Sequence, residues 1–276
     1  MVIRDQRRQE QVTAAVSAIQ EQFGLLRPLS REHHERSITR FHSGVTHDSR
    51  YMEPFQLAIT RAEGAYKWDA DGFRYVDFVT GHGSLILGHS HPKVVEAVAR
   101  QLPLGTHLGG NHALEVEWAE QVCALVPGAE RVRFVSSGTE ATMLAIRLAR
   151  VFTGRTTLVQ FQTHFHGWND TTFGGIGAAG LPVSLRSAAR VLPCGDYEAV
   201  REALSDETVA AVIIETSNPT FFTLPDPAAF LRFLRTGLRS FDSFELKRNV
   251  PGRCWSWTRS SAAFAGLPVG PSKHTE

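Results

Sequence analysis

The sequence predicts an α/β protein built on a mostly parallel sheet with helices on both faces. Between residues 111 and 235, amphipathic helical segments alternate with short and fully apolar strands such as TTLVQF and AAVIIE. Strands that are apolar throughout are buried on both faces, which is typical of a parallel sheet covered by helices. In such sheets ligands bind at the carboxyl ends of the strands, so the residues that follow each strand are the first candidates for a site.

The composition is that of a globular protein without a strong charge bias. The 276 residues are 42% hydrophobic and 21% charged, which is too apolar for a disordered chain. Lys+Arg number 29 and Asp+Glu number 28, so no basic field exists that would attract nucleic acid or an acidic membrane. No apolar run reaches the roughly 20 residues of a membrane helix, and no secretory signal is visible. We therefore expect a soluble, cytoplasmic protein.

The cysteines and histidines do not indicate a metal site. The three cysteines, Cys123, Cys194 and Cys254, form no CxxC pair, which argues against a disulfide scaffold and a structural zinc site. His33 and His34 stand in a charged run that is typical of a solvated face. We expect no bound metal.

Residues 1–80 predict a helical arm followed by a small antiparallel unit. Apolar residues recur at helical spacing between charged residues in the arm, up to Phe23. Residues 56–79 then hold short segments rich in β-branched and aromatic residues. Asp71-Gly72, between AYKWD and FRYVDF, is a strong hairpin signal.

Residues 81–235 hold the predicted sheet. Pro92 suits the first turn of a helix, and the predicted buried stripe of that helix is Val94, Val95, Val98 and Leu102. Further helices are predicted at ALEVEWAEQVCALV, EATMLAIRLARVF, DYEAVREALS and PAAFLRFLR, and strands at RVRFV, TTLVQF and AAVIIE. Residues 236–276 have no sustained period of either 2 or 3.6, so the pattern ends near residue 235.

The first candidate site lies in VSSGTEA, where a predicted strand ends and a helix begins. Ser137, Gly138 and Thr139 place backbone N–H groups and hydroxyls at the positive end of the helix dipole, which is a site for anions and most often for phosphate. In the alternative interpretation, Ser137 and Glu140 only form a capping box. The segment is neither a Walker loop nor a G-x-G-x-x-G motif, so nucleotide binding is not favoured.

Two further candidates follow the other predicted strands. Phe165 and His166, in the run HFHG beyond TTLVQF, suit stacking and hydrogen bonding to a planar ligand. The alternatives are that His164 and His166 form a metal pair, which is not favoured because no third ligand is evident, or that they are partly exposed loop residues. Glu215 ends AAVIIE, where a buried carboxylate is costly unless it has a partner or a function, and the alternative is a surface position just past the sheet.

Taken together, these segments resemble the class III, fold-type I pyridoxal-phosphate aminotransferases, and within them the group of glutamate-1-semialdehyde 2,1-aminomutase and similar aminotransferases. The resemblance covers about residues 40–235. The matching text is GVTHDSRYMEPF, ITRAEGAYKWDADGFRYVDF, LILGHSHPKVVEAV, the long run from ALEVEWAEQ through SSGTEATMLAIRLARVFTGR, FHGWND and AVIIE. The SSGTEA and FHG elements are specific in this order and spacing.

The resemblance implies a pyridoxal 5'-phosphate site. Residues 137–139 would hold the cofactor phosphate, Phe165 would stack on the pyridine ring, and His166 would adjoin it. Glu215 matches a strand-end glutamate that lies beside the cofactor, although Thr216 follows it where the family usually has proline. The fold implied is an incomplete large domain over residues 81–235, preceded by a small N-terminal α/β unit.

Two family residues have no counterpart in the sequence. The family needs a lysine that links covalently to the cofactor and an aspartate that faces the pyridinium nitrogen. Downstream of Glu215 the chain offers Asp242, Lys247 and Lys273, none in the family's surroundings, so we assign no catalytic residue. We expect a chain truncated near residue 235, with a non-family tail over residues 236–276 of the kind that a frameshift gives.

Three functions are consistent with these observations. The first is an aminotransferase or aminomutase that acts on an amino or keto acid, as a homodimer in keeping with the family. The second is a catalytically inactive remnant that binds the cofactor weakly or pairs with a full-length relative. The third is an α/β protein that binds another phosphorylated ligand at residues 137–139.

Overall fold

The computed structural model describes most of the chain and divides it into two units. The units are Met1–Gly109 and Gly110–Glu276. The described residues are 2–126, 129–172, 180–182, 188–239 and 262–264. The three-part division that the sequence predicts stays a prediction.

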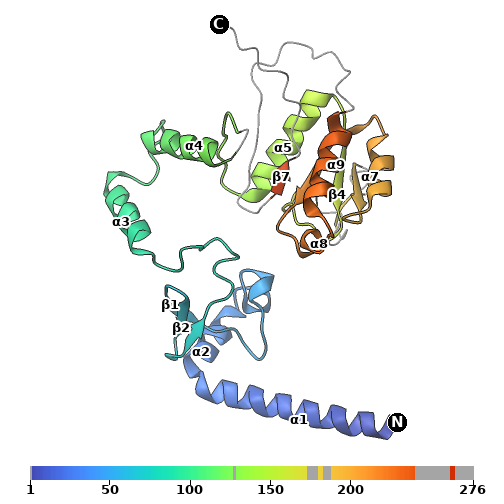
Figure 1. Ribbon diagram of the computed structural model, residues 1–276. Helices are drawn as coiled ribbons and strands as arrows, with labels where there is room; N and C mark the ends of the chain where they lie inside the picture. The colour runs from blue at the N-terminus through green and yellow to red at the C-terminus, as the bar shows by residue number, and fades with distance from the viewer. Residues whose placement is uncertain (1, 127–128, 173–179, 183–187, 240–261, 265–276) are drawn as a thin grey trace. The chain divides into compact units, whose positions relative to one another are not determined.

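The first unit combines a helical N-terminal part with a small sheet (Figure 1). Its long helices are α1 (Val2–Leu26) and α2 (Pro28–Ser37), followed by two short 3-10 helices, His42–Gly44 and Asp48–Arg50. The three-stranded antiparallel sheet consists of β1 (Ile59–Glu63), β2 (Tyr66–Asp69) and β3 (Arg74–Val76). Gly72 in the turn between β2 and β3 has a φ of +88°, which confirms the predicted hairpin.

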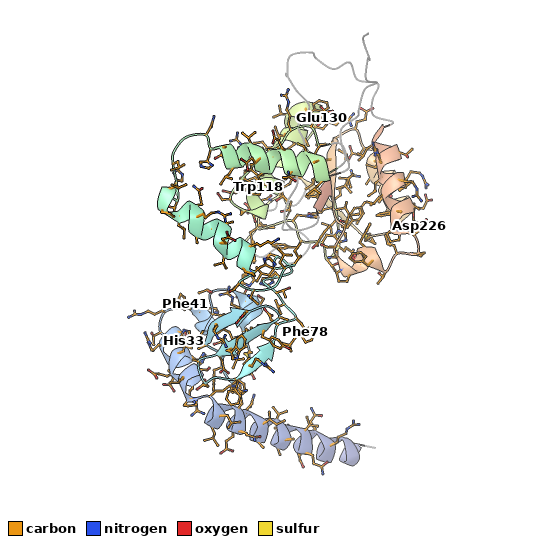
Figure 2. All side chains as sticks on the ribbon, turned by 60° about the vertical axis from the view of Figure 1, so that its left-hand side comes forward. His33, Phe41, Phe78, Trp118, Glu130 and Asp226 are labelled. Atoms are coloured by element: carbon orange, nitrogen blue, oxygen red, sulfur yellow. The ribbon has the colours of Figure 1, made fainter. Side chains whose placement is uncertain are left out.

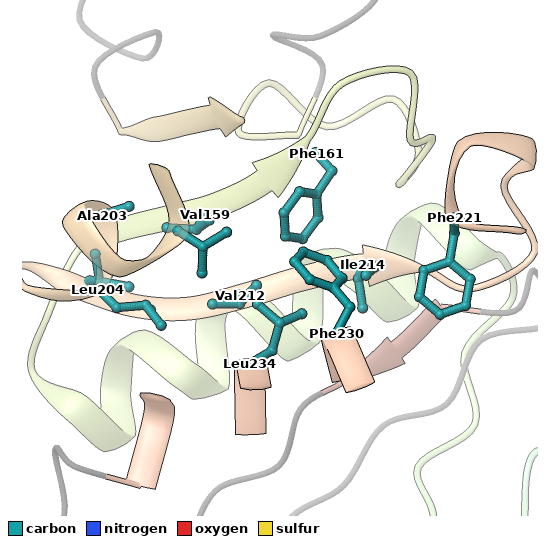
Figure 3. Packing of buried hydrophobic residues seen from close by; sticks show 11 residues of the cluster. Val159, Phe161, Ala203, Leu204, Val212, Ile214, Phe221, Phe230 and Leu234 are labelled. Atoms are coloured by element: carbon teal, nitrogen blue, oxygen red, sulfur yellow. The ribbon is translucent and has the colours of Figure 1, made fainter. Parts of the chain in front are cut away.

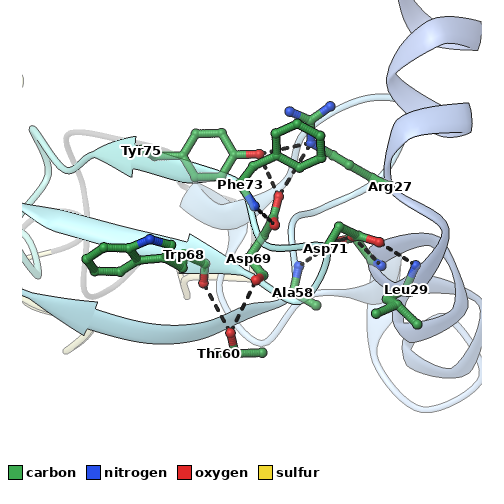
Figure 4. A network of polar contacts seen from close by, with 10 residues as sticks. Arg27, Leu29, Ala58, Thr60, Trp68, Asp69, Asp71, Phe73 and Tyr75 are labelled. Carbon is green, nitrogen blue, oxygen red and sulfur yellow. Dashed lines mark hydrogen bonds and ion pairs between the residues drawn. The ribbon is translucent and has the colours of Figure 1, made fainter.

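A polar network joins α2 to this sheet (Figure 4). The Arg27 side chain donates a hydrogen bond of 2.9 Å to the Tyr75 hydroxyl and lies 3.5 Å from the Asp69 carboxylate. Tyr75 in turn donates to Asp69 over 2.6 Å. At the start of α2, the Asp71 carboxylate accepts a hydrogen bond of 2.8 Å from the N–H of Leu29. The turn residue therefore also satisfies the free N-terminal amides of the helix.

Helix α3 (Pro92–Gln101) forms where the sequence predicts it, but its predicted buried stripe is exposed. Val94, Val95, Val98 and Leu102 all lie open to solvent, so the prediction of burial is wrong for the described chain. The stripe has the spacing of a buried face, but the described residues place no layer over it. In the same unit Phe78 is 92% exposed (Figure 2).

The second unit is a four-stranded sheet with helices on both faces. Its strands are β4 (Thr157–Phe161), β5 (Ala189–Leu192), β6 (Val209–Glu215) and β7 (Ala262–Phe264), in the order β5-β4-β6-β7. β4 runs parallel to β5 and β6, whereas β7 is antiparallel to β6. Its helices are α4 (Ala113–Leu125), α5 (Gly138–Thr153), α7 (Tyr197–Leu204), α8 (Pro219–Phe222) and α9 (Pro227–Arg239).

Burial on the two faces of the sheet shows which helices cover it. One face of β4 and β6 packs against α7 and α9, and the Phe161 and Phe230 rings meet edge to face with centroids 5.5 Å apart (Figure 3). On the other face, Ile146 and Ala149 of α5 pack against Leu158. The predicted α/β fold with a mostly parallel, doubly covered sheet is confirmed.

Three details differ from the prediction. RVRFV (131–135) forms no strand, and the Phe134 ring instead stacks on Trp118 of α4 with centroids 3.9 Å apart. A strand forms only where its backbone hydrogen-bonds to a neighbouring strand. The described sheet ends at β5 on one side and at β7 on the other, and residues 131–135 pair with neither edge. Strands β5 and β7 were not predicted. Of the predicted tail, residues 236–239 belong to α9 and residues 262–264 form β7. The remainder of that tail, with Asp242, Lys247 and Lys273, lies outside the described residues.

None of the described helices is long and apolar enough to cross a membrane.

Candidate functional site

Three segments of the second unit meet at one edge of its sheet. Parallel strands β4 and β6 end side by side, at Phe161 and Glu215. The loop after β4 reaches both other segments. The N–H of Phe165 donates to the Glu215 carboxylate over 2.9 Å, and the N–H of Trp168 donates to the Thr139 hydroxyl at the start of α5 over 3.3 Å. The structure therefore brings together the three segments that the sequence singled out.

Gly167 makes the close approach between the loop and α5 possible. Its φ is +97°, and a Cβ built on it would lie 2.6 Å from Thr139 Oγ1 and 2.8 Å from Thr139 Cα. No larger residue fits against that backbone. One turn further along α5, the Thr142 hydroxyl donates to the carbonyl of His166 over 2.7 Å. The loop therefore contacts the helix at both His166 and Gly167.

The start of α5 forms the Ser137 half of the capping box of the alternative interpretation, while Glu140 reaches the residue before the N-cap. Ser137 is the N-cap, and its hydroxyl accepts a hydrogen bond of 3.2 Å from the N–H of Glu140. The Glu140 carboxylate accepts from the N–H of Ser136 over 2.7 Å. Within the described chain, however, the N–H groups of Gly138 and Thr139 donate to no protein acceptor. Two donors thus stay available to an anion beside the cap.

The loop after β4 carries one exposed ring, Phe165, and one buried ring, His166. The Phe165 side chain is 40% exposed and meets the Trp168 ring edge to face, with centroids 6.3 Å apart. His166 is only 3% exposed, and neither ring nitrogen has a hydrogen-bond partner among the described residues. Burial, with a smaller contribution from His164, lowers the pKa of His166 to about 4, so its imidazole is neutral at pH 7. A buried imidazole without partners indicates a site for a polar group or water.

Glu215 is half-buried and well bonded at the end of β6, so it is not a free surface carboxylate. Besides the N–H of Phe165, its carboxylate accepts from the Asn218 side-chain amide over 3.2 Å and from the Ser217 hydroxyl over 3.4 Å. These donors offset the cost of burying the charge. Sequence reasoning missed Asn218, although an Asn before Pro219 is a recognisable start for the short helix α8.

No lysine lies in the described part of the second unit. Lys67 and Lys93 belong to the first unit, where the Lys67 amine lies 3.3 Å from the Asp77 carboxylate. The remaining two, Lys247 and Lys273, fall outside the described residues. The described site therefore offers two backbone amides without a protein acceptor, an aromatic face and a bonded carboxylate, but no amine.

Comparison with known proteins gives consistent matches over most of the chain. The family model for Aminotransferase class-III matches residues 47–238. A glutamate-1-semialdehyde 2,1-aminomutase of Methanothrix thermoacetophila is 39% identical over 196 residues, which are 67% of this chain and 46% of that protein.

Solved structures agree with this. An omega-transaminase from Sphaerobacter thermophilus superposes with a TM-score of 0.72 at 31% identity, over 77% of this chain and 52% of that chain. A β-phenylalanine aminotransferase from Variovorax paradoxus gives 0.73 at 30% identity, over 83% and 53%. A structure described as a transaminase with PLP bound gives 0.71 at 30% identity, over 78% and 53%. The chain spans about half the length of the relatives that it matches.

Proposed function

The chain belongs to the class III aminotransferase family, and on that premise we propose that it holds the phosphate and ring side of a pyridoxal 5'-phosphate site in an aminotransferase or aminomutase. The observation that carries the proposal is the meeting of the free α5 amides, the exposed Phe165 ring and Glu215 at one sheet edge. In open α/β sheets this edge is where ligands bind.

The residues present fit the phosphate and the ring of that cofactor. The N–H groups of Gly138 and Thr139 point out of the first turn of α5, where the helix dipole favours a phosphate. The Ser137 hydroxyl stands beside them. Phe165 offers an open aromatic face for stacking on a pyridine ring, and the buried His166 has two unused ring nitrogens next to it in the chain.

When bound, the cofactor supplies an electron sink for moving an amino group. The residues of this chain bind and orient it. Residues 137–139 fix the phosphate, the Phe165 ring shields one face from water, and Glu215 holds the backbone of Phe165 in place. None of the described residues of the second unit carries a side-chain amine, so we assign no catalytic residue among them.

Further features of the proposal follow the family. We propose an amino or keto acid as substrate, a cytoplasmic location and a homodimer. Support for pairing comes from the first unit, where the valines of α3 and the side chain of Phe78 are exposed apolar surface. Analytical ultracentrifugation tests the dimer, and a monomer at all concentrations would contradict it.

The test of the site is a titration of the whole chain with pyridoxal 5'-phosphate and with pyridoxal, which lacks the phosphate. We expect quenching of tryptophan fluorescence by the phosphorylated form at much lower concentration, since Trp168 packs on Phe165. Equal binding of both compounds, or selective binding of a nucleotide, would contradict the proposal.

Borohydride reduction and peptide mapping of the same samples decide whether the chain carries a covalent anchor. One stoichiometric label on Lys247 or Lys273 would identify the lysine of a working enzyme. Cofactor binding without a label would identify a binding protein that lacks the chemistry.

A further inference from the structure

His164 lies between the ends of β4 and β6 with both ring nitrogens engaged. Its side chain is 3% exposed. Nδ1 accepts a hydrogen bond of 3.0 Å from the backbone N–H of Glu215, and Nε2 lies 3.2 Å from the Thr220 hydroxyl. The neighbouring His166 is as buried but has neither bond, so burial alone does not account for the contacts of His164.

These contacts define the tautomer of His164. A backbone N–H can only donate, so Nδ1 carries no proton and Nε2 carries it. Nε2 therefore donates to the Thr220 hydroxyl, which donates its own proton to Asn218 Oδ1 over 2.7 Å. The Asn218 amide then donates to Glu215 Oε2 over 3.2 Å.

The chain of hydrogen bonds closes on itself at Glu215. His164 holds the backbone of Glu215, and Asn218 holds its carboxylate. The same carboxylate oxygen, Oε2, accepts the N–H of Phe165 over 2.9 Å, and Phe165 follows His164 directly in the chain. Each member thus fixes its neighbour, and a closed network of partly buried hydrogen bonds is more rigid than its separate pairs.

We propose that His164 is a positioning residue that, as the neutral Nε2–H tautomer, holds Glu215 and thereby sets the Phe165 ring at the cofactor face. The inference rests on the proposed function, because the Phe165 ring has a cofactor to stack on only if the site binds one. His164 itself contacts the backbone of Glu215 and the Thr220 hydroxyl, and acts only through them.

A second proton on His164 would open this network. It would place an N–H on Nδ1 directly against the N–H of Glu215, and that hydrogen bond would be lost. The titratable groups that face the ring are Glu215 and His166. Burial lowers the pKa of His164, while the charge of Glu215 opposes this, so the network stays closed at neutral pH and opens only in acid.

Four variants of the full chain separate the two bonds. H164N keeps an acceptor near the position of Nδ1 and loses the donor, H164Q keeps a donor near Nε2 and loses the acceptor, and H164L loses both. T220V removes the hydroxyl alone. The matched control is H107N, at an exposed histidine of the first unit.

The first measurement needs no cofactor. Amide hydrogen exchange at Glu215 and Phe165 should be about tenfold faster in H164L than in the wild-type chain, the effect of one lost hydrogen bond, and nearly unchanged in H164N. The second measurement is the dissociation constant for pyridoxal 5'-phosphate, for which we expect the same ranking of the variants. H164L and H164Q should bind the cofactor about tenfold more weakly than the wild-type chain, and H164N within about threefold of it. In acid, wild-type affinity should fall more steeply than that of H164N.

The outcomes distinguish this inference from the proposed function. If wild-type chain binds no pyridoxal 5'-phosphate, both fail. If it binds and H164L matches H107N in exchange and affinity, only the role of His164 fails. If H164L does not fold, the comparison of H164N with H164Q decides, and equal values for those two would overturn the proposal.

Discussion

Replacing Gly167 by alanine should destabilise the second unit by about 3 kcal/mol. A left-handed backbone costs a residue with a Cβ about 1–2 kcal/mol, and Gly167 has a φ of +97°. The new methyl would also lie 2.8 Å from Thr139 Cα, a backbone atom that cannot move aside as a flexible side chain can. Overpacking of this kind adds about 1–3 kcal/mol.

The matched control is G154A, at the left-handed residue that ends α5. Gly154 has a φ of +69°, and a Cβ there would meet no atom within 4 Å. That variant should carry the backbone strain alone, about 1 kcal/mol. Denaturant unfolding of the two proteins, followed by far-UV circular dichroism, therefore isolates the clash as a difference of about 2 kcal/mol.

The same clash predicts a loss of cofactor affinity in G167A but not in G154A. Moving the loop off α5 lengthens the 3.3 Å hydrogen bond between Trp168 and Thr139. If G167A unfolds within about 0.5 kcal/mol of G154A, the close approach does not exist in solution, and the reasoning from it is refuted.

Three further predictions concern the core, the first unit and the start of α5. Phe230 is fully buried against the sheet, so F230A should cost about 3–5 kcal/mol in denaturant unfolding, and a loss below 1 kcal/mol would contradict the packing. The hydrogen bond from His89, 2.7 Å long, holds the pKa of Asp77 well below its usual range. The ionised Asp77 carboxylate therefore stabilises the fold fully above its unfolded pKa of about 3.9, and this stabilisation is lost as the pH falls through the pKa of Asp77 in the folded state. Thermal unfolding of D77N should accordingly depend less on acid pH than that of the wild type. E140Q removes the negative charge that accepts the N–H of Ser136 at the start of α5. The variant should bind pyridoxal 5'-phosphate about threefold more tightly while α5 loses about 0.5 kcal/mol, measured by titration and thermal unfolding.

Elements with a local signal were predictable from the sequence. The hairpin follows from Asp71-Gly72, and the class of sheet from the apolar strands β4 and β6. The class III resemblance is confirmed by the family match. RVRFV has the composition of a strand but forms none, because a strand exists only when a second backbone pairs with it, and no single segment encodes its partner.

The candidate site divides in the same way. Ser137 and Phe165 can be recognised from a few neighbouring residues. Ser137 stands at the turn into a helix, and Phe165 is an aromatic residue just after a strand. Their roles toward a cofactor stay predictions. The bond between His164 and Glu215 joins residues 51 positions apart, and no periodicity signals it. The exposed stripe of α3 shows the converse, since its spacing predicts a burial that the described chain does not provide.

The loop between His164 and Gly167 is anchored at both ends by unrelated means. At one end a histidine is bonded to β6, and at the other a glycine fits against the backbone of α5. Either anchor alone would hold only one end of the loop. Phe165 and His166 lie between the two anchors. The ring and the buried imidazole are therefore held by long-range contacts on both sides, and the loop sequence by itself would not place them.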